Sequence, residues 1–173
     1  SLFNRITKYK FGIFTLQEYL RFYYKFIDIS EQKEVNQASF HLIQSYYAYD
    51  FFKQKLKNIK ILYDYQNEKI ILNSKNIKHS KENLICYSHK CSDFIHLVKE
   101  KSNNKFIKLQ NYNQKKIIEI FKKTKIYIDF GYHPGKDKMP REAVLNDNCI
   151  ITNYKGSAKK KYDIPISKKF KFE

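Results

Sequence analysis

One short segment in the last third of the chain concentrates residue types that bind anions. Between an apolar run that ends at Phe130 and a helical pattern near Pro140, the sequence reads Gly131-Tyr132-His133-Pro134-Gly135-Lys136-Asp137-Lys138-Met139. Glycines let the backbone approach a ligand closely, and free amide groups at a helix N-terminus attract phosphate. The amides of residues 133–138 are therefore expected to form an anion site between a strand and a helix.

Charged side chains in and after this loop give the expected site its polarity. Lys136, Lys138 and Arg141 add positive charge that suits a phosphate. Glu142 lies in the first turn of the following helix, where its carboxylate either complements the helix dipole or accepts hydrogen bonds from sugar hydroxyls. The sequence leaves both roles open. We expect the carboxylate to face the cleft rather than solvent or a lysine of its own helix.

The surrounding sequence alternates between strand and helix patterns. Apolar runs of strand length occupy residues 83–87, 105–109, 126–130 and 149–152, and helical patterns between them cover 92–101, the stretch after the cap Asn113, and 140–146. This alternation predicts an α/β domain with a Rossmann-like parallel sheet and helices on both faces. Such sheets bind ligands outside the carboxyl ends of their strands, so the loops after Tyr87, Leu109, Phe130 and Thr152 should form the site.

The first half of the chain is less regular. The spacing of apolar residues predicts a helix over 16–28, a strand over 40–44, a helix over 45–57 and a strand over 59–65. A connection rich in Lys and Asn, residues 66–82, then leads into the alternating region. We therefore expect a partial N-terminal α/β segment over residues 1–82, and the Rossmann-like domain over residues 83–173.

The composition excludes several classes of protein. Of the 173 residues 42% are apolar and 17% aromatic, so the chain can bury a core and is not a disordered tail. The sequence shows no run of about 18 to 20 apolar residues, which a membrane span would need, and no apolar signal segment after Ser1. We expect a cytoplasmic protein that can contact the inner face of a membrane, with residues missing at one or both ends because the sequence starts without Met.

The strongest compositional signal is the net charge of +17, from 34 Lys and Arg against 17 Asp and Glu. This excess favours anionic partners such as nucleotides, nucleic acid or an anionic membrane. Solvated surface lysine in a sequence rich in Lys, Asn and Ile explains much of it as well. A nucleic-acid-binding module is disfavoured, because the aromatic residues fall on apolar faces and no recognition motif is present.

The three cysteines are Cys86, Cys91 and Cys149. Their odd number and unpaired spacing indicate a reducing compartment rather than a disulfide framework. Cys86 and Cys149 lie within apolar runs and are expected in the core. His89 lies close to Cys91, but the further ligands at the spacing that zinc requires are lacking, so no metal site is expected.

Three stretches in the second half of the chain carry a resemblance to a known family. Residues 109–130 run from a strand through a turn and a helix into another strand, and residues 140–153 open a helix with Glu142-Ala143 and end in an apolar strand. A glycine loop, Lys155-Gly156-Ser157-Ala158, follows. This order resembles the carboxy-terminal, donor-binding half of GT-B glycosyltransferases. Together with residues 127–137 and Gln44-Ser45-Tyr46-Tyr47-Ala48, it is more narrowly similar to bacterial glycosyltransferase-like proteins associated with surface polysaccharide genes.

The resemblance implies an activity. It implies transfer of a sugar from a nucleotide-sugar donor, which is a substrate and not a cofactor, to a saccharide or lipid-linked acceptor, without a bound metal. Glu142 matches the acid that holds the donor ribose in this family. The partner acid of that signature stands eight residues earlier, where this sequence has Pro134. His133 and Asp137 in the same loop are the candidates to take its place as catalytic groups.

The resemblance also implies which residues bind the donor. Lys136, Lys138 and the loop amides would hold the diphosphate, together with Lys90 after the first strand of this half. The set is completed by Gly135, Asn111 and Gly156. A full two-domain enzyme of this type needs roughly twice this length, and the first acid is missing. A noncatalytic nucleotide-binding or interaction protein of the same fold is therefore a second class to consider.

Overall fold

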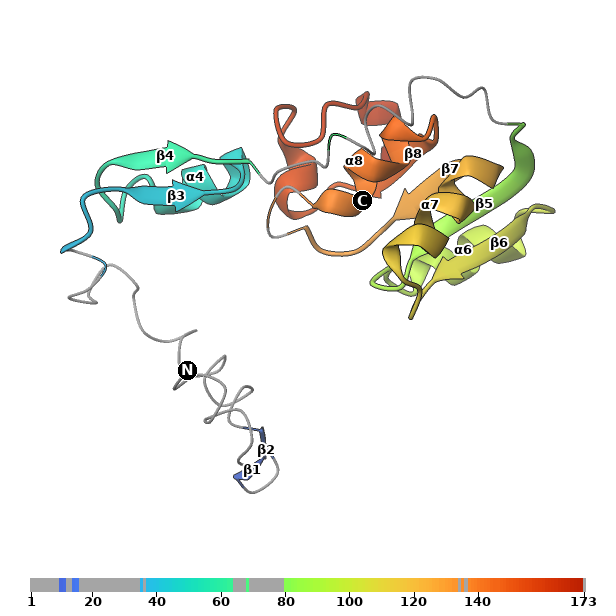
Figure 1. Ribbon diagram of the computed structural model, residues 1–173, viewed down its shortest axis with the longest axis horizontal. Helices are drawn as coiled ribbons and strands as arrows, with labels where there is room; N and C mark the ends of the chain where they lie inside the picture. Colours follow the sequence, from blue (N-terminus) through green and yellow to red (C-terminus); the bar gives the residue numbers. More distant parts are fainter. Residues whose placement is uncertain are drawn as a thin grey trace. The chain divides into compact units, whose positions relative to one another are not determined.

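The computed structural model describes residues 10–11, 14–15, 35, 37–63, 68, 80–133, 135 and 137–172 (Figure 1). The chain divides into two compact units. One consists of Ser1–His41 and Phe52–Lys60, and the other of Leu42–Phe51 and Ile61–Glu173. The second unit contains a five-stranded sheet in which every neighbouring pair of strands is parallel. The predicted α/β class with a Rossmann-like sheet is confirmed.

The strands of this sheet lie in the order β6-β5-β7-β8-β9. Their bounds are β5 Glu82–Ser88, β6 Lys105–Leu109, β7 Thr124–Asp129, β8 Cys149–Asn153 and β9 Lys171–Phe172. The first four are the strands that the sequence predicts, and they are parallel as expected. The two-residue edge strand β9 is not apparent from the sequence, because so short a segment shows no periodicity.

The strand order reverses direction between β5 and β7. The chain passes from β5 to β6 on one side and then returns to β7 and β8 on the other. Because crossovers between parallel strands are right-handed, a reversal of direction places the connecting helices on opposite faces of the sheet. The loops after β5 and β7 consequently diverge at the carboxyl edge and leave a crevice between them, where ligands of such sheets bind.

Three helices cover the two faces of the sheet as predicted: α6 Phe94–Glu100, α7 Gln114–Lys123 and α8 Lys138–Leu145. Side chains alternate between the faces along β5, because successive residues of a strand point in opposite directions. Ile85 packs with Ile95 of α6 in one core cluster, whereas Cys86 packs with Phe121 of α7 and Ala143 of α8 in the other.

Local signals explain where the helices begin. The Asn113 side chain accepts a hydrogen bond from the Lys116 amide at 2.9 Å and so caps α7, as the sequence predicts. The start of α8 differs from the prediction. It begins at Lys138, two residues before the expected Pro140, which lies in the first turn of the helix and lacks only an N–H that would have no intrahelical partner there.

The N-terminal half contains the predicted strand, helix and strand within narrower bounds. They are β3 His41–Ile43, α4 Tyr46–Phe52 and β4 Ile59–Ile61. The His41 amide donates to the Asn58 carbonyl and the Leu62 amide donates to the Ile43 carbonyl, a pattern of parallel pairing. A short antiparallel pair, β1 Lys10–Phe11 with β2 Phe14–Thr15, precedes them. The helix predicted over 16–28 lies outside the described residues.

A buried carboxylate from the far end of the chain caps α4. The two oxygens of Asp163, a residue only 2% exposed, accept hydrogen bonds from the amides of Tyr46 at 2.8 Å and Tyr47 at 2.9 Å. Ser45 accepts a further bond from the Ala48 amide through its hydroxyl. A negative charge at the positive end of the helix dipole is favourable, so Asp163 stabilises the first turn of α4.

Two expectations about single residues have different outcomes. Cys86 is buried, and burial raises the pKa of its thiol to about 11. The prediction that Cys149 is buried was wrong: Cys149 is exposed as the first residue of β8, whereas Ile150, the next residue of the strand, is buried. Among the described residues, no helix is both long and apolar enough to cross a membrane.

The Lys81 side chain bonds the C-terminal ends of two helices. Its ammonium group donates to the carbonyl oxygens of Phe121 at 2.7 Å and Thr124 at 3.0 Å, and also to that of Asn146. These carbonyls lie at the C-terminal ends of α7 and α8, which carry partial negative charge. One cation thus satisfies acceptors that no helix amide can reach.

We predict that Lys81→Met lowers the free energy of unfolding by about 2 to 3 kcal/mol, because the methionine keeps the apolar stem but leaves these carbonyls without a charged donor. Urea denaturation measures this loss. Lys125→Met is the matched control, since exposed Lys125 makes one hydrogen bond to Asn83; it should cost less than about 0.5 kcal/mol. Equal losses for the two variants would contradict the role of Lys81.

Candidate functional site

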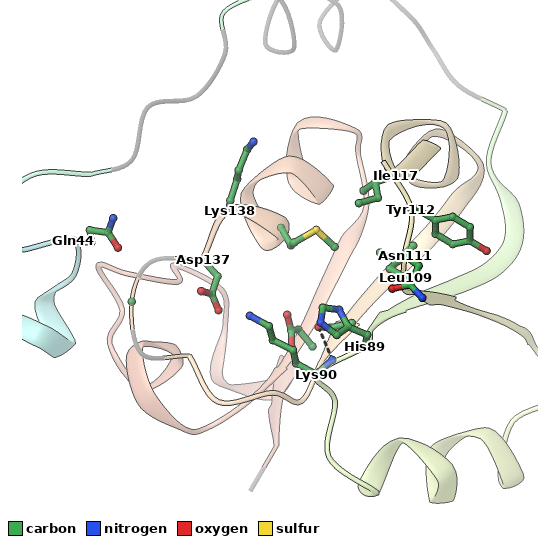
Figure 2. A pocket seen from close by; sticks show the side chains of 13 residues that line it. Gln44, His89, Lys90, Leu109, Asn111, Tyr112, Ile117, Asp137 and Lys138 are labelled. Atoms are coloured by element: carbon green, nitrogen blue, oxygen red, sulfur yellow. Dashed lines mark hydrogen bonds between the residues drawn. The ribbon is translucent and has the colours of Figure 1, made fainter. Parts of the chain in front are cut away.

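A cavity of about 440 Å³ lies at the carboxyl ends of the central strands, where the strand order reverses (Figure 2). It is lined by residues from the loops after the first three strands of the sheet, from the start of α8, and from two further positions: Ser88, His89, Lys90, Leu109, Asn111, Tyr112, Asp129, Gly135, Asp137, Lys138 and Met139, with Ile117 and Gln44. The sequence analysis predicts a site at this edge of the sheet, from the loops that follow these strands.

The structure brings some of the predicted site residues together and separates others. Lys90, Asn111, Gly135, Asp137 and Lys138 all line the cavity. His133 is fully buried and does not line the cavity, and neither Glu142 nor Gly156 lines it. Lys136 lies outside the described residues, as does Pro134.

Cationic and neutral polar side chains occupy different parts of the cavity. In Figure 2, His89 and Lys90 from the loop after β5 lie between Asp137 on one side and Asn111 and Tyr112 on the other. Asn111 adopts a left-handed backbone conformation with φ of 58°, which asparagine tolerates better than most residues. The turn after β6 therefore places an amide and an aromatic side chain opposite the acid.

Asp129 at the end of β7 is a site residue that the sequence analysis did not select. It is buried and accepts hydrogen bonds from the Tyr127 hydroxyl at 2.7 Å and the Gly131 amide at 3.0 Å. Burial, followed by the neighbouring Asp129 carboxylate, raises the pKa of Tyr127 well above its usual value. An acid at the end of an apolar strand was the available signal, because side chains at that position reach the ligand edge of a parallel sheet.

His133 makes polar contacts through both ring nitrogens. Nδ1 lies 2.6 Å from Oδ2 of Asp137, and Nε2 lies 3.4 Å from the carbonyl oxygen of Asp129. Burial alone would lower the pKa of His133. The hydrogen bond to Asp137 and the negative charges of Asp129 and Asp137 outweigh burial, so the pKa lies above its ordinary value. The structure thus places the two candidate catalytic residues, His133 and Asp137, in one hydrogen-bonded pair.

The turn after β8 makes hydrogen bonds to the backbone of the loop that carries His133. Gly156 begins the short helix η2 Gly156–Lys159 with φ of 56°. The Ser157 amide donates to the His133 carbonyl at 2.8 Å, and the Ser157 hydroxyl donates to the Gly135 carbonyl at 2.6 Å. A Cβ atom on residue 156 would lie 2.1 Å from the His133 carbonyl oxygen. Gly156 therefore supports the loop through its backbone.

The expected orientation of Glu142 was wrong. Its side chain is 1% exposed, and Oε1 accepts a hydrogen bond from Nε2 of the Gln114 side chain at 2.7 Å and lies 3.2 Å from Nζ of Lys138. The reason is the start of α8. Because the helix begins at Lys138, that lysine stands one turn before Glu142 on the same helix face. The sequence analysis had placed Lys138 in the loop.

The comparisons with known proteins identify no relative. No family model matches the chain, and neither a curated protein nor a solved structure matches it. Within the part of the chain that the structure describes, no group of three or more His, Cys, Asp or Glu side chains could hold a metal ion. Functional inference consequently depends on the geometry of the cavity and on the chemistry of the side chains around it.

We predict that Gly156→Ala lowers the free energy of unfolding by at least about 2 kcal/mol. An alanine with this φ costs about 1 kcal/mol or more, and its Cβ would displace the His133 carbonyl. Thermal and urea unfolding measure the loss.

Gly135→Ala is the control for this variant. Among the residues that the structure describes, the nearest atom to the added Cβ would be Oε1 of Gln44 at 3.4 Å, an ordinary van der Waals contact. We expect a change within about 0.5 kcal/mol. If both glycines tolerate alanine equally, the η2 turn does not hold the loop.

Proposed function

We propose that the chain binds a nucleotide diphosphate sugar in the cavity at the carboxyl edge of the sheet, and that it is the donor-binding half of a GT-B-type glycosyltransferase. The reaction is transfer of the sugar to a saccharide or lipid-linked acceptor in the synthesis of a bacterial surface polysaccharide. Such an acceptor and the positive charge of the chain are compatible with work at the cytoplasmic face of an anionic membrane.

One observation carries this proposal: cationic side chains line a cavity at the reversal of strand order. Its volume of about 440 Å³ falls within the range of small-molecule sites, roughly 300 to 1,000 Å³. The cations are Lys90 from the loop after β5 and Lys138 in the first turn of α8, and His89 also lines the cavity. Positive side chains beside a helix N-terminus suit the two phosphates of a nucleotide diphosphate.

The other lining groups suit the remaining parts of the donor. Asn111 offers both hydrogen-bond donors and an acceptor, and the Tyr112 ring offers a face for a base. Lys90 and Lys138 would neutralise the diphosphate that leaves when the sugar is transferred, which is where negative charge develops. Holding donor and acceptor in one orientation would supply the rest of the rate enhancement.

A noncatalytic nucleotide-binding protein of the same fold is the second candidate, favoured by the position of Glu142. The carboxylate that the resemblance assigns to the ribose already bonds to Gln114 and Lys138. A donor ribose would have to compete with both. Release of nucleoside diphosphate from a bound nucleotide sugar, in the presence of a panel of acceptor saccharides, distinguishes a transferase from a protein that only binds.

We predict that calorimetry with the full chain detects binding of at least one nucleotide diphosphate sugar among UDP-, GDP- and TDP-sugars. Lys90→Ala should weaken this binding by about ten- to hundred-fold, because a charge-assisted hydrogen bond contributes roughly 1.5 to 3 kcal/mol. Lys125→Ala, an exposed lysine near the opposite end of β7, should leave the affinity unchanged.

Two outcomes would contradict the proposal. One is that no member of the panel binds at millimolar concentration, and the other is that Lys90→Ala has no effect. Binding of oligonucleotides with a steep salt dependence, without binding of any nucleotide sugar, would instead indicate the nucleic-acid class.

A further inference from the structure

His133 has acceptors at both ring nitrogens. The residue has 0% relative exposure, so water cannot replace its partners. The atoms near Nε2 are the Asp129 carbonyl oxygen at 3.4 Å and Oδ1 of the same residue at 3.9 Å. Nδ1 faces Oδ2 of Asp137 at 2.6 Å. Carbonyl and ionised carboxylate oxygens only accept hydrogen bonds.

These partners determine the protonation state of the ring. Nε2 must carry a proton to bond a carbonyl oxygen, and Nδ1 must carry one to bond an ionised carboxylate. An imidazole with both nitrogens protonated is a cation. The length of the contact to Asp137 is that of a charge-assisted hydrogen bond. The two contacts together suit an imidazolium between two acids, which agrees with the raised pKa of this histidine.

Asp137 differs from Asp129 in its access to solvent. The Asp137 side chain is 35% exposed and lines the cavity, whereas Asp129 is buried and already accepts bonds from Tyr127 and Gly131. The imidazole ring contacts one oxygen of Asp137, Oδ2, and restricts the orientations that the carboxylate can take. An ionised carboxylate held at a cavity wall accepts hydrogen bonds from hydroxyl groups of a ligand.

Two carboxylates, those of Asp129 and Asp137, face the single positive charge of the His133 ring, so the three groups together are negative. Asp129 of β7 and Asp137 before α8 face the ring, and η2 contributes backbone, with its Ser157 amide bonded to the His133 carbonyl. Of the cavity's cationic side chains, Lys138 lies beside Glu142, and Lys90 extends from the loop after β5. Two carboxylates and one imidazolium thus form an acceptor site next to a cationic one.

We propose that Asp137 recognises the sugar hydroxyls of the donor and that His133 is a positioning residue that holds Asp137 oriented toward the cavity. This inference rests on the proposed function and names the residue that distinguishes a nucleotide sugar from a nucleotide. Hydroxyl donors of a sugar suit the acceptor site, and the diphosphate suits the neighbouring cations.

The first test compares two ligands in calorimetry with the full chain. UDP and UDP-glucose serve as probes, replaced by the corresponding pair if another base binds more tightly in the panel. Asp137→Asn should weaken binding of UDP-glucose about ten-fold and change that of UDP by less than about two-fold, because UDP lacks the sugar. The control is Asp147→Asn, an exposed position after α8 whose left-handed backbone suits asparagine; both affinities should stay unchanged.

The second test observes His133 directly by nitrogen-15 NMR of the imidazole ring. We expect both ring nitrogens to be protonated at neutral pH, and Asp137→Asn to shift the titration of the ring to lower pH. In the unmodified chain, the ratio of UDP-glucose to UDP affinity should fall as pH rises through the same midpoint. If His133 only packed against the loop, the ratio of UDP-glucose to UDP affinity would not change at the pH at which the ring titrates.

The outcomes separate this inference from the proposed function. Equal weakening of UDP and UDP-glucose by Asp137→Asn would overturn sugar recognition by Asp137 while nucleotide binding stands. A ring with one unprotonated nitrogen at neutral pH would overturn the positioning role of His133. If no nucleotide or nucleotide sugar binds, the proposed function fails and sugar recognition fails with it, whereas the NMR titration still decides whether His133 and Asp137 form a charged pair.

Discussion

The candidate site depends on one backbone contact, the approach of Gly156 to the His133 carbonyl. No side chain fits between them, since a Cβ atom on residue 156 would lie 2.1 Å from that oxygen. The contact lets the Ser157 amide and hydroxyl bond the carbonyls of His133 and Gly135. The backbone of the loop after β7 is therefore fixed. This positions the buried imidazole of His133 and the carboxylate of Asp137, which lines the cavity. Loops that bind ligands need such rigid support to hold their side chains in one geometry.

The charges of the chain act locally, although its net charge is +17. Buried Asp163 caps the first turn of α4, and Lys81 bonds the carbonyls at the ends of α7 and α8. Each charge thus complements the partial charge of a helix end. Lys138 similarly compensates Glu142, which is almost fully buried. The proposed binding site would use only the few cations that the sheet edge brings together, such as Lys90 and Lys138.

Much of the fold could be predicted because the relevant signals are local. Apolar runs and helical spacing located β5, β6, β7 and β8 and the helices between them, since periodicity follows from the geometry of each element. The loop after β7 was likewise recognisable from its glycines and charges. Prediction failed where the outcome depended on one or two residues. The two-residue strand β9 is too short to show periodicity. Cys149 is exposed because it is the first residue of its apolar run, and α8 begins two residues before Pro140.

The sequence by itself determined the class of the sheet, the connecting helices and the edge at which a ligand would bind. Tertiary structure alone decided which side chains meet at that edge. Because α8 begins at Lys138, this lysine forms an ion pair with Glu142. The turn after β8 positions the loop so that His133 contacts both Asp129 and Asp137. The physical reason is the range of the interactions. Helix and strand patterns arise from neighbours a few residues apart, whereas the partners of a buried charge come from whichever segments the packed core brings within hydrogen-bond distance.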